Sequence, residues 1–297
     1  MRAWATAAWI IGLLLSTWVA AQQPAAPAAP AGAGAAQAAP PAQDPWPGRK
    51  KVLAIGDART SFQHDSVSHA LATIERLGRE SGAFVTVIRT DSQLITKSPI
   101  PRPALNTKNL DFFDAIFFFG AGPGDLTPQQ MQDLLAFVRD DGKGFVAAHT
   151  GDNAFQPHPE YANMIGGAWD HPWTRADRLV ANLPITVEDP AFPAMSSLPP
   201  AFQVVDEVAV HKAPYARGNV RVLASLDFDK VDRSLARDPR DTDVPVAWAK
   251  PYGKGRVFYS VLGHSDESWD NPLVQRMFVD ALRWATGLVP GDASPRR

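Results

Sequence analysis

The feature of this chain that most constrains its fold is a series of short apolar runs, each followed directly by polar residues. The runs cover residues 52–55, 115–119, 145–148, 204–205 and 257–262. The polar groups that follow them are Asp57 with His64, the loop 120–125, His149, Asp206 with Glu207, and His264. Continuous apolar runs are typical of strands covered on both faces. Because ligands in open α/β sheets bind beyond the carboxyl ends of the strands, we expect these polar residues to share one site.

Amphipathic stretches between the runs predict helices. Residues 66–81 carry apolar side chains at helical spacing, and Asp65 or Ser66 is expected to cap this helix. The sequence Thr-Pro-Gln-Gln at 127–130 is a capping box with proline at the first helical position. A last helix is expected between residues 271 and 287. Alternation of these helices with the apolar runs predicts an α/β fold, with a doubly wound, mostly parallel sheet and helices on both faces.

The second half of the chain predicts additional, antiparallel strands. These are expected at residues 179–187, 202–210, 220–226, 244–249 and 256–262. A Tyr-Gly-Lys-Gly turn at 252–255 makes the last two a hairpin. Residues 169–173 are expected to form an aromatic loop, and 227–243 an exposed loop.

The amino-terminal residues have the pattern of an export signal. Arg2 precedes the apolar stretch 10–15, and the small residues at 19–21 offer a cleavage site. Residues 1–21 are therefore predicted to be a signal peptide; an uncleaved anchor is the alternative, but the apolar stretch is short for a span. Four parts are expected: the signal peptide 1–21, a disordered Ala/Pro-rich linker 22–48, one domain 49–288, and a disordered tail 289–297. The protein is then periplasmic or secreted, with no membrane span after cleavage.

Charge and cysteine content exclude several functions. The formal net charge is −2 and no basic run occurs, so nucleic acid is not an expected partner. The chain has no cysteine, which excludes disulfides, thiol nucleophiles and thiolate metal ligands.

An ordered set of motifs resembles the ThuA-like (trehalose utilisation) family. The motifs are Phe-Gln-His-Asp-Ser at 62–66, Gly-Phe-Val-Ala-Ala-His at 144–149, Tyr161, Gly166-Gly167, His171-Pro172, Asp206-Glu207, Gly-Lys-Gly-Arg-Val-Phe-Tyr at 253–259, and Gly263-His264. The resemblance covers roughly residues 50–287 and implies a flavodoxin-like sheet similar to that of class I glutamine amidotransferases. It also implies carbohydrate-linked metabolism, with a small-molecule carbohydrate as the partner. Where relatives often carry a histidine, this chain has Phe192, so no chemistry of that histidine is assigned here.

His149 and His264 are the predicted catalytic residues. His149 occupies the position of the amidotransferase nucleophile, but an imidazole cannot form the thioester that amide hydrolysis by those enzymes requires. Histidine can exchange protons near neutral pH, which suits acid/base work or metal binding. The alternative is that either histidine only stabilises its turn through a hydrogen bond.

Other residues are predicted to bind substrate or metal. An acid in the valine-rich run at 204–208 is costly without a partner, and the resemblance favours Glu207 over Asp206 as the one that faces the site. The predicted substrate-binding residues are His64, Asp57, Trp169, His171, Trp173 and Glu207. The sequence by itself assigns no cofactor, and a divalent metal such as zinc, held by His149, Glu207 and His264, is a further hypothesis. The remaining histidines, at positions 69, 158 and 211, are expected to be structural.

Two classes of function follow. The first is an exported enzyme, a hydrolase or isomerase, that acts on a sugar or sugar derivative by histidine-mediated acid/base chemistry, with or without a metal. The second is a non-catalytic carbohydrate-binding protein, for which the linker and the tryptophans also fit.

Overall fold

The computed structural model describes residues 45–57, 62–100 and 108–296. Of the two units of the chain, Met1–Asp44 and Pro45–Arg297, only the second contains described residues. The predicted signal peptide and residues 22–44 of the predicted linker lie outside them. None of the described helices is both long and apolar enough to cross a bilayer.

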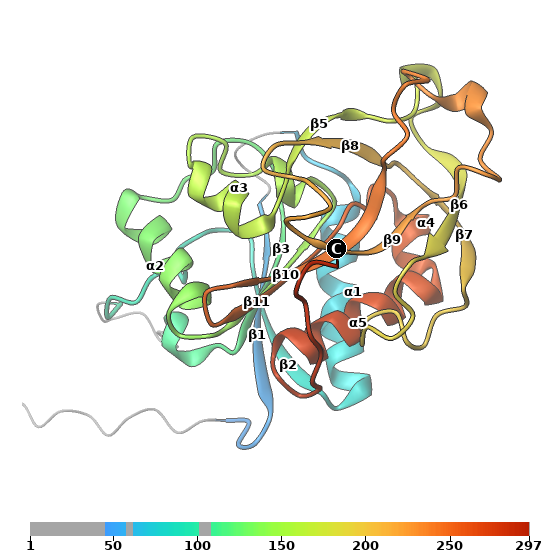
Figure 1. Ribbon diagram of the computed structural model, residues 1–297. Coiled ribbons are helices and arrows are strands. Elements are labelled where there is room, and N and C mark those ends of the chain that lie inside the picture. The colour runs from blue at the N-terminus through green and yellow to red at the C-terminus, as the bar shows by residue number, and fades with distance from the viewer. Residues whose placement is uncertain (1–44, 58–61, 101–107, 297) are drawn as a thin grey trace, which may run out of the picture. The chain divides into compact units, whose positions relative to one another are not determined.

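A nine-stranded sheet forms the centre of the described part of the chain (Figure 1). Its strands are β1 (Lys50–Gly56), β2 (Phe84–Arg89), β3 (Ala115–Phe119), β4 (Gly144–Ala148), β6 (Ala181–Val187), β7 (Ala201–Asp206), β9 (Arg221–Leu226), β10 (Pro245–Tyr252) and β11 (Gly255–Ser260). They lie in the order β2-β1-β3-β4-β11-β10-β9-β6-β7. The pairings from β2 to β11 are parallel, and those from β11 to β7 are antiparallel. The predicted parallel sheet with an antiparallel extension is confirmed.

Helices cover both faces of this sheet. They are α1 (Ser66–Ser81), α2 (Pro128–Arg139), α3 (Pro159–Ile165), α4 (Asp266–Asp270) and α5 (Pro272–Ala285). The helices α1, α4 and α5 contact one another on one face, whereas α2 and α3 lie together on the other (Figure 1). The core strands β3 and β4 are buried along their whole length between these layers, which explains their uninterrupted apolar sequences.

Local sequence signals set the starts of α2 and α5. Thr127 and Gln130 form both hydrogen bonds of the predicted capping box, and Asn271 caps α5 by accepting from the Leu273 amide. The predicted side-chain cap of α1 is wrong, since Asp65 makes no cap hydrogen bond. The Ser66 hydroxyl instead donates to the carbonyl oxygens of Gly263 and His264, so it ties the start of α1 to a distant loop.

Three predicted segments differ from the structure. The expected loop at 169–173 is largely a strand, β5 (Ala168–Pro172), which pairs with β8 (Ala209–Lys212) in a separate two-stranded sheet. The expected strand 202–210 is therefore two strands, β7 and β8, in different sheets. The expected loop 227–243 contains a short 3-10 turn at Arg233–Leu235, with Leu235 buried.

The carboxyl-terminal residues also differ from expectation. Residues 289–296, expected to be disordered, pack against the domain: the Trp284 indole donates to the Gly291 carbonyl, and Arg296 pairs with the buried carboxylate of Asp189. Ala293 is buried as well and adds an apolar contact to this packing. Asp189 lies 107 positions before Arg296 in the sequence, and local composition does not reveal this contact.

Candidate functional site

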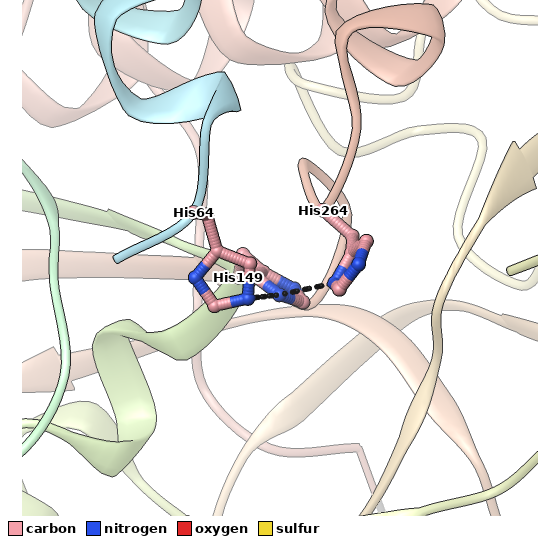
Figure 2. A group of neighbouring side chains, drawn as sticks. All are labelled: His64, His149 and His264. Carbon is pink, nitrogen blue, oxygen red and sulfur yellow. Dashed lines mark hydrogen bonds between the residues drawn. The ribbon is translucent and has the colours of Figure 1, made fainter. Parts of the chain in front are cut away.

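The side chains of three histidines lie close together, as Figure 2 shows, and each histidine comes after a strand of the parallel half of the sheet. His64 lies between β1 and α1, His149 directly follows β4, and His264 lies between β11 and α4. The Nε2 atom of His149 is 3.0 Å from Nε2 of His64 and 3.1 Å from Nδ1 of His264. Residues far apart in the sequence therefore meet because parallel strands end at the same edge of the sheet.

The ring of His149 is held in one orientation. Its backbone has a φ of 48°, a left-handed conformation that is uncommon for a residue other than glycine and that turns the chain sharply after β4. Its Nδ1 lies 2.9 Å from the carbonyl oxygen of Val261. Since a carbonyl only accepts, Nδ1 carries the hydrogen, and Nε2 of the neutral ring presents a lone pair to the other two histidines. The Tyr259 hydroxyl donates to the His149 carbonyl at 2.7 Å and steadies the turn.

Glu207 extends the cluster on the side of His264. Its Oε2 lies 2.7 Å from Nδ1 of His264, the same nitrogen that faces His149. Both residues are mostly buried, with 10% and 19% of their side chains exposed. A short contact between an acid and an imidazole in this setting is suited to passing a proton.

Asp206, the neighbour of Glu207, builds the loop that carries His264. Its carboxylate accepts from the amides of Gly263 and His264 at 2.7 and 3.0 Å. It also accepts from the Ser268 hydroxyl at 2.5 Å. The residue is fully buried, and this burial raises the pKa of its carboxyl to about 6 despite the donors around it. Asp206 thus positions His264, while Glu207 contacts it.

The three imidazoles differ in pKa. Burial, together with the nearby charge of His264, lowers the pKa of His64 to about 4. Burial also holds the pKa of His149 well below its usual value. Burial acts to lower the pKa of His264 as well, but the hydrogen bond and charge of Glu207 outweigh it and raise that pKa. At neutral pH His64 and His149 are therefore neutral and offer lone pairs.

A pocket of about 450 Å³ opens over the cluster. It is lined by Phe62, His64, Ala121, His149, Thr150, Asn153, Trp169, Pro172, Leu179, Glu207, Ala209, Val261 and His264. Its walls are mostly apolar, and its polar side chains are those of the three histidines, Glu207, Thr150 and Asn153, with the indole of Trp169. A cavity with an apolar wall and a few convergent polar groups is the usual form of a small-molecule site.

The fold and these motifs agree with a comparison of the sequence with known families. Residues 51–285 match the family described as ThuA, trehalose utilisation. The chain belongs to the ThuA family. A comparison with curated proteins finds no match.

Solved structures of ThuA-like proteins share the fold of this ThuA-family chain. A putative ThuA-like protein from Bacteroides uniformis aligns with a TM-score of 0.63 at 21% identity, over 84% of this chain and 95% of the other. A second, from Parabacteroides merdae, aligns with a TM-score of 0.59 at 17% identity, over 84% and 98% of the two chains. At these identities the likeness concerns the fold alone.

Two of the aromatic and polar residues expected in the site of this ThuA-family protein lie apart from the pocket. Trp173 is fully buried and packs against Phe228, so it offers no surface to a sugar and the expectation is corrected. His171 lies between the carboxylates of Asp170 and Asp241, at 3.1 and 2.9 Å, and does not line the pocket. An irregularity in the β5–β8 pairing between Trp169 and His171 breaks the alternation of side chains, so only Trp169 of this pair faces the pocket.

Asp57 is a third expected residue that does not line the pocket. Its backbone amide donates to the Phe119 carbonyl at 2.9 Å, and its Cβ lies close to Gly120. It therefore contributes to the turn after β1. His64, Trp169 and Glu207, by contrast, line the pocket, and their role in substrate binding stays a prediction.

Behind the cluster lies a buried group that sequence reasoning did not find. Nε2 of His211, which was expected to be structural, is 3.2 Å from a carboxylate oxygen of Asp152, and both side chains are fully buried. The ring of His211 also contacts the ring of Tyr259, and the Tyr259 hydroxyl donates to the carbonyl of His149. The position of Asp152, three residues after His149, is the one signal in the sequence that could have indicated this group.

Proposed function

We propose that this ThuA-family protein is an exported enzyme that acts on a sugar or sugar derivative bound in the pocket over the three histidines. The observation that carries the proposal is that the three imidazoles and the Glu207 carboxylate together line a largely apolar pocket. Membership of a family named for trehalose utilisation supports a carbohydrate as substrate. The sequence of residues 1–21 supports export.

Different residues of the pocket lining serve binding and chemistry. Trp169 supplies a flat apolar surface of the kind that stacks on the carbon–hydrogen face of a sugar ring. The contact between His264 and Glu207 also lies in the pocket lining, where it can take a proton from a hydroxyl or carbon of the substrate and return it. This chemistry serves a hydrolase or an isomerase, and it requires no thiol.

The proposal is tested by activity of the full chain on a panel of sugars, glycosides and their oxidised derivatives, with products identified by mass spectrometry and NMR. Glu207→Gln keeps the shape of the side chain but cannot accept a proton, so we expect turnover to fall by about 100-fold or more. His69→Ala is the matched control, because His69 pairs with Asp270 on the surface and lies outside the pocket. Full turnover in Glu207→Gln contradicts the assignment, and binding of a sugar without conversion identifies the protein as a binding module.

A further inference from the structure

We propose that His64, His149 and His264 form a binding site for one divalent transition-metal ion, with Glu207 beside the metal as the proton-accepting group. This inference deepens the proposed function and rests on it, because the substrate is the sugar or sugar derivative proposed above. It assigns the imidazoles to the metal and leaves proton transfer to the carboxylate.

The spacing of the ring nitrogens matches a metal site. Two nitrogens that each lie about 2.0–2.1 Å from a tetrahedral ion are roughly 3.3 Å from one another. Here the His149–His64 and His149–His264 distances are 3.0 and 3.1 Å, and the ligand atoms of all three residues lie within 4.8 Å of one another. Among the described residues, this is the one group of three or more metal-binding side chains that meets this spacing.

The hydrogen bonds that the three imidazoles can form among themselves do not satisfy all of their close nitrogen–nitrogen contacts. The lone pair on Nε2 of His149 faces two imidazole nitrogens, but it can accept one well-aligned hydrogen bond. The Nδ1–H of His264 is in turn shared between His149 and Glu207, which is the closer acceptor at 2.7 Å. A cation placed among the three rings would engage the lone pairs of His64 and His149, and that of Nδ1 of His264 once this nitrogen gives up its proton on metal binding.

The surroundings of His149 are those of a metal ligand. Its second ring nitrogen donates to a backbone carbonyl, the arrangement that fixes the tautomer and orientation of most metal-bound histidines. His149 is also 4% exposed and enclosed by the other two rings, so it is better placed to hold an ion than to reach a substrate. The pocket leaves the opposite side of the cluster open, where a water or a substrate oxygen could complete the coordination.

The loops that carry the other two ligands are fixed before any ion binds. Asp206 holds the amide of His264, and Ser66 donates to its carbonyl oxygen. Ser66 also follows His64 by two residues, so one hydroxyl links the two loops. The donor chemistry favours zinc, iron, nickel or copper over magnesium, calcium or manganese, because imidazole nitrogen suits the former and oxygen ligands suit the latter. Such an ion would polarise a substrate carbonyl or acidify a bound water.

The test uses the full chain produced without a histidine tag. Metal content is measured by mass spectrometry after purification, and the chelator-treated protein is then titrated with Zn²⁺ in a calorimeter and with Co²⁺ in a spectrophotometer. We expect one ion per chain, visible Co²⁺ bands from nitrogen coordination, and a higher melting temperature with Zn²⁺. His64→Ala and His264→Ala, at the two less buried ligands, should each weaken Zn²⁺ binding by about 100-fold or more, since even residues that only support a ligand contribute 10- to 100-fold.

Two further variants separate metal binding from other effects. Glu207→Gln should keep one ion per chain while turnover is lost. His69→Ala should keep both the bound ion and turnover. Metal below about 0.1 ion per chain in every preparation, with neither calorimetric heat nor Co²⁺ bands on titration, overturns the metal site. Turnover of a sugar by such metal-free protein would leave the proposed function intact. Stoichiometric metal binding without conversion of any sugar would instead contradict the proposed function and leave the metal site standing.

Discussion

Asp206 shows how one buried side chain can decide the geometry of a site that it does not line. Its carboxylate accepts from two consecutive backbone amides, those of Gly263 and His264, and from a serine hydroxyl. These bonds fix the backbone from which the His264 ring projects, and the Glu207 amide completes the set with a bond of 2.8 Å. A buried carboxylate with four donors restricts the loop far more strongly than apolar packing would.

We predict that Asp206→Asn lowers the free energy of unfolding by about 1–3 kcal/mol, because the amide replaces one acceptor oxygen with a donor facing other donors. The freed loop should also reduce turnover of a sugar substrate. Asp133→Asn is the matched control: Asp133 is a buried carboxylate on α2 that accepts from Thr96, Lys97 and Gln129, away from the pocket. Chemical denaturation and steady-state kinetics should show a stability loss in both variants and a kinetic loss in Asp206→Asn alone. Equal kinetics in the two variants would refute the positioning role of Asp206.

At the scale of elements, the helices and parallel strands were readable from local sequence, whereas β5 was not. Thr127 and Pro128 mark the start of α2 in the sequence, and the apolar residues of this helix recur at helical spacing. The residues of β5 include a histidine and a proline and show no alternation. This strand exists because it pairs with β8, whose residues come about 40 positions later, and that contact depends on the folded chain.

Two tryptophans, one in β5 and one directly after it, lie in different environments, and we predict different effects for their substitution. Trp169→Ala should weaken binding of a sugar by about 0.5–1.5 kcal/mol, the range for an aromatic contact, with little change in stability, since this indole lines the pocket. Trp173→Ala, just beyond the strand, should lower the free energy of unfolding by about 3–5 kcal/mol because a fully buried indole is removed. Calorimetric titration with a sugar that the protein turns over or binds, beside thermal unfolding, measures both. A stable Trp173→Ala variant with lost sugar binding would reverse the two assignments.

At the scale of the whole molecule, the site depends on the arrangement of the sheet. His64, His149 and His264 follow three strands, β1, β4 and β11, that all lie in the parallel half. Glu207 follows β7 at the far edge of the antiparallel half, yet it contacts His264 because the chain leaves the large sheet there and turns toward β8. The pocket therefore combines groups from both halves of the sheet.

From the first residues of the chain we predict that the whole protein is exported. Fusion of residues 1–21 to a reporter that is active only outside the cytoplasm should give activity in a bacterial host, with cleavage after Ala21. Amino-terminal sequencing of the full chain recovered from the periplasm or medium should begin at Gln22. A matched fusion in which charged residues replace two leucines of the apolar stretch should remain inside. An uncleaved chain that fractionates with membranes would instead identify an anchor.

Sequence by itself determined the parallel strands, the helices α1, α2 and α5, the capping box at Thr127, and the group of histidines that would follow the parallel strands. These features depend on side-chain periodicity and on the fixed direction of parallel strands, which are local or general properties. The tertiary structure alone decided that Trp173 and His171 lie apart from the pocket, that Asp206 builds the loop of His264, and that His149 faces two other imidazoles. Each of these depends on the contacts a side chain makes with residues distant in the chain, and one irregular pairing between strands is enough to redirect them.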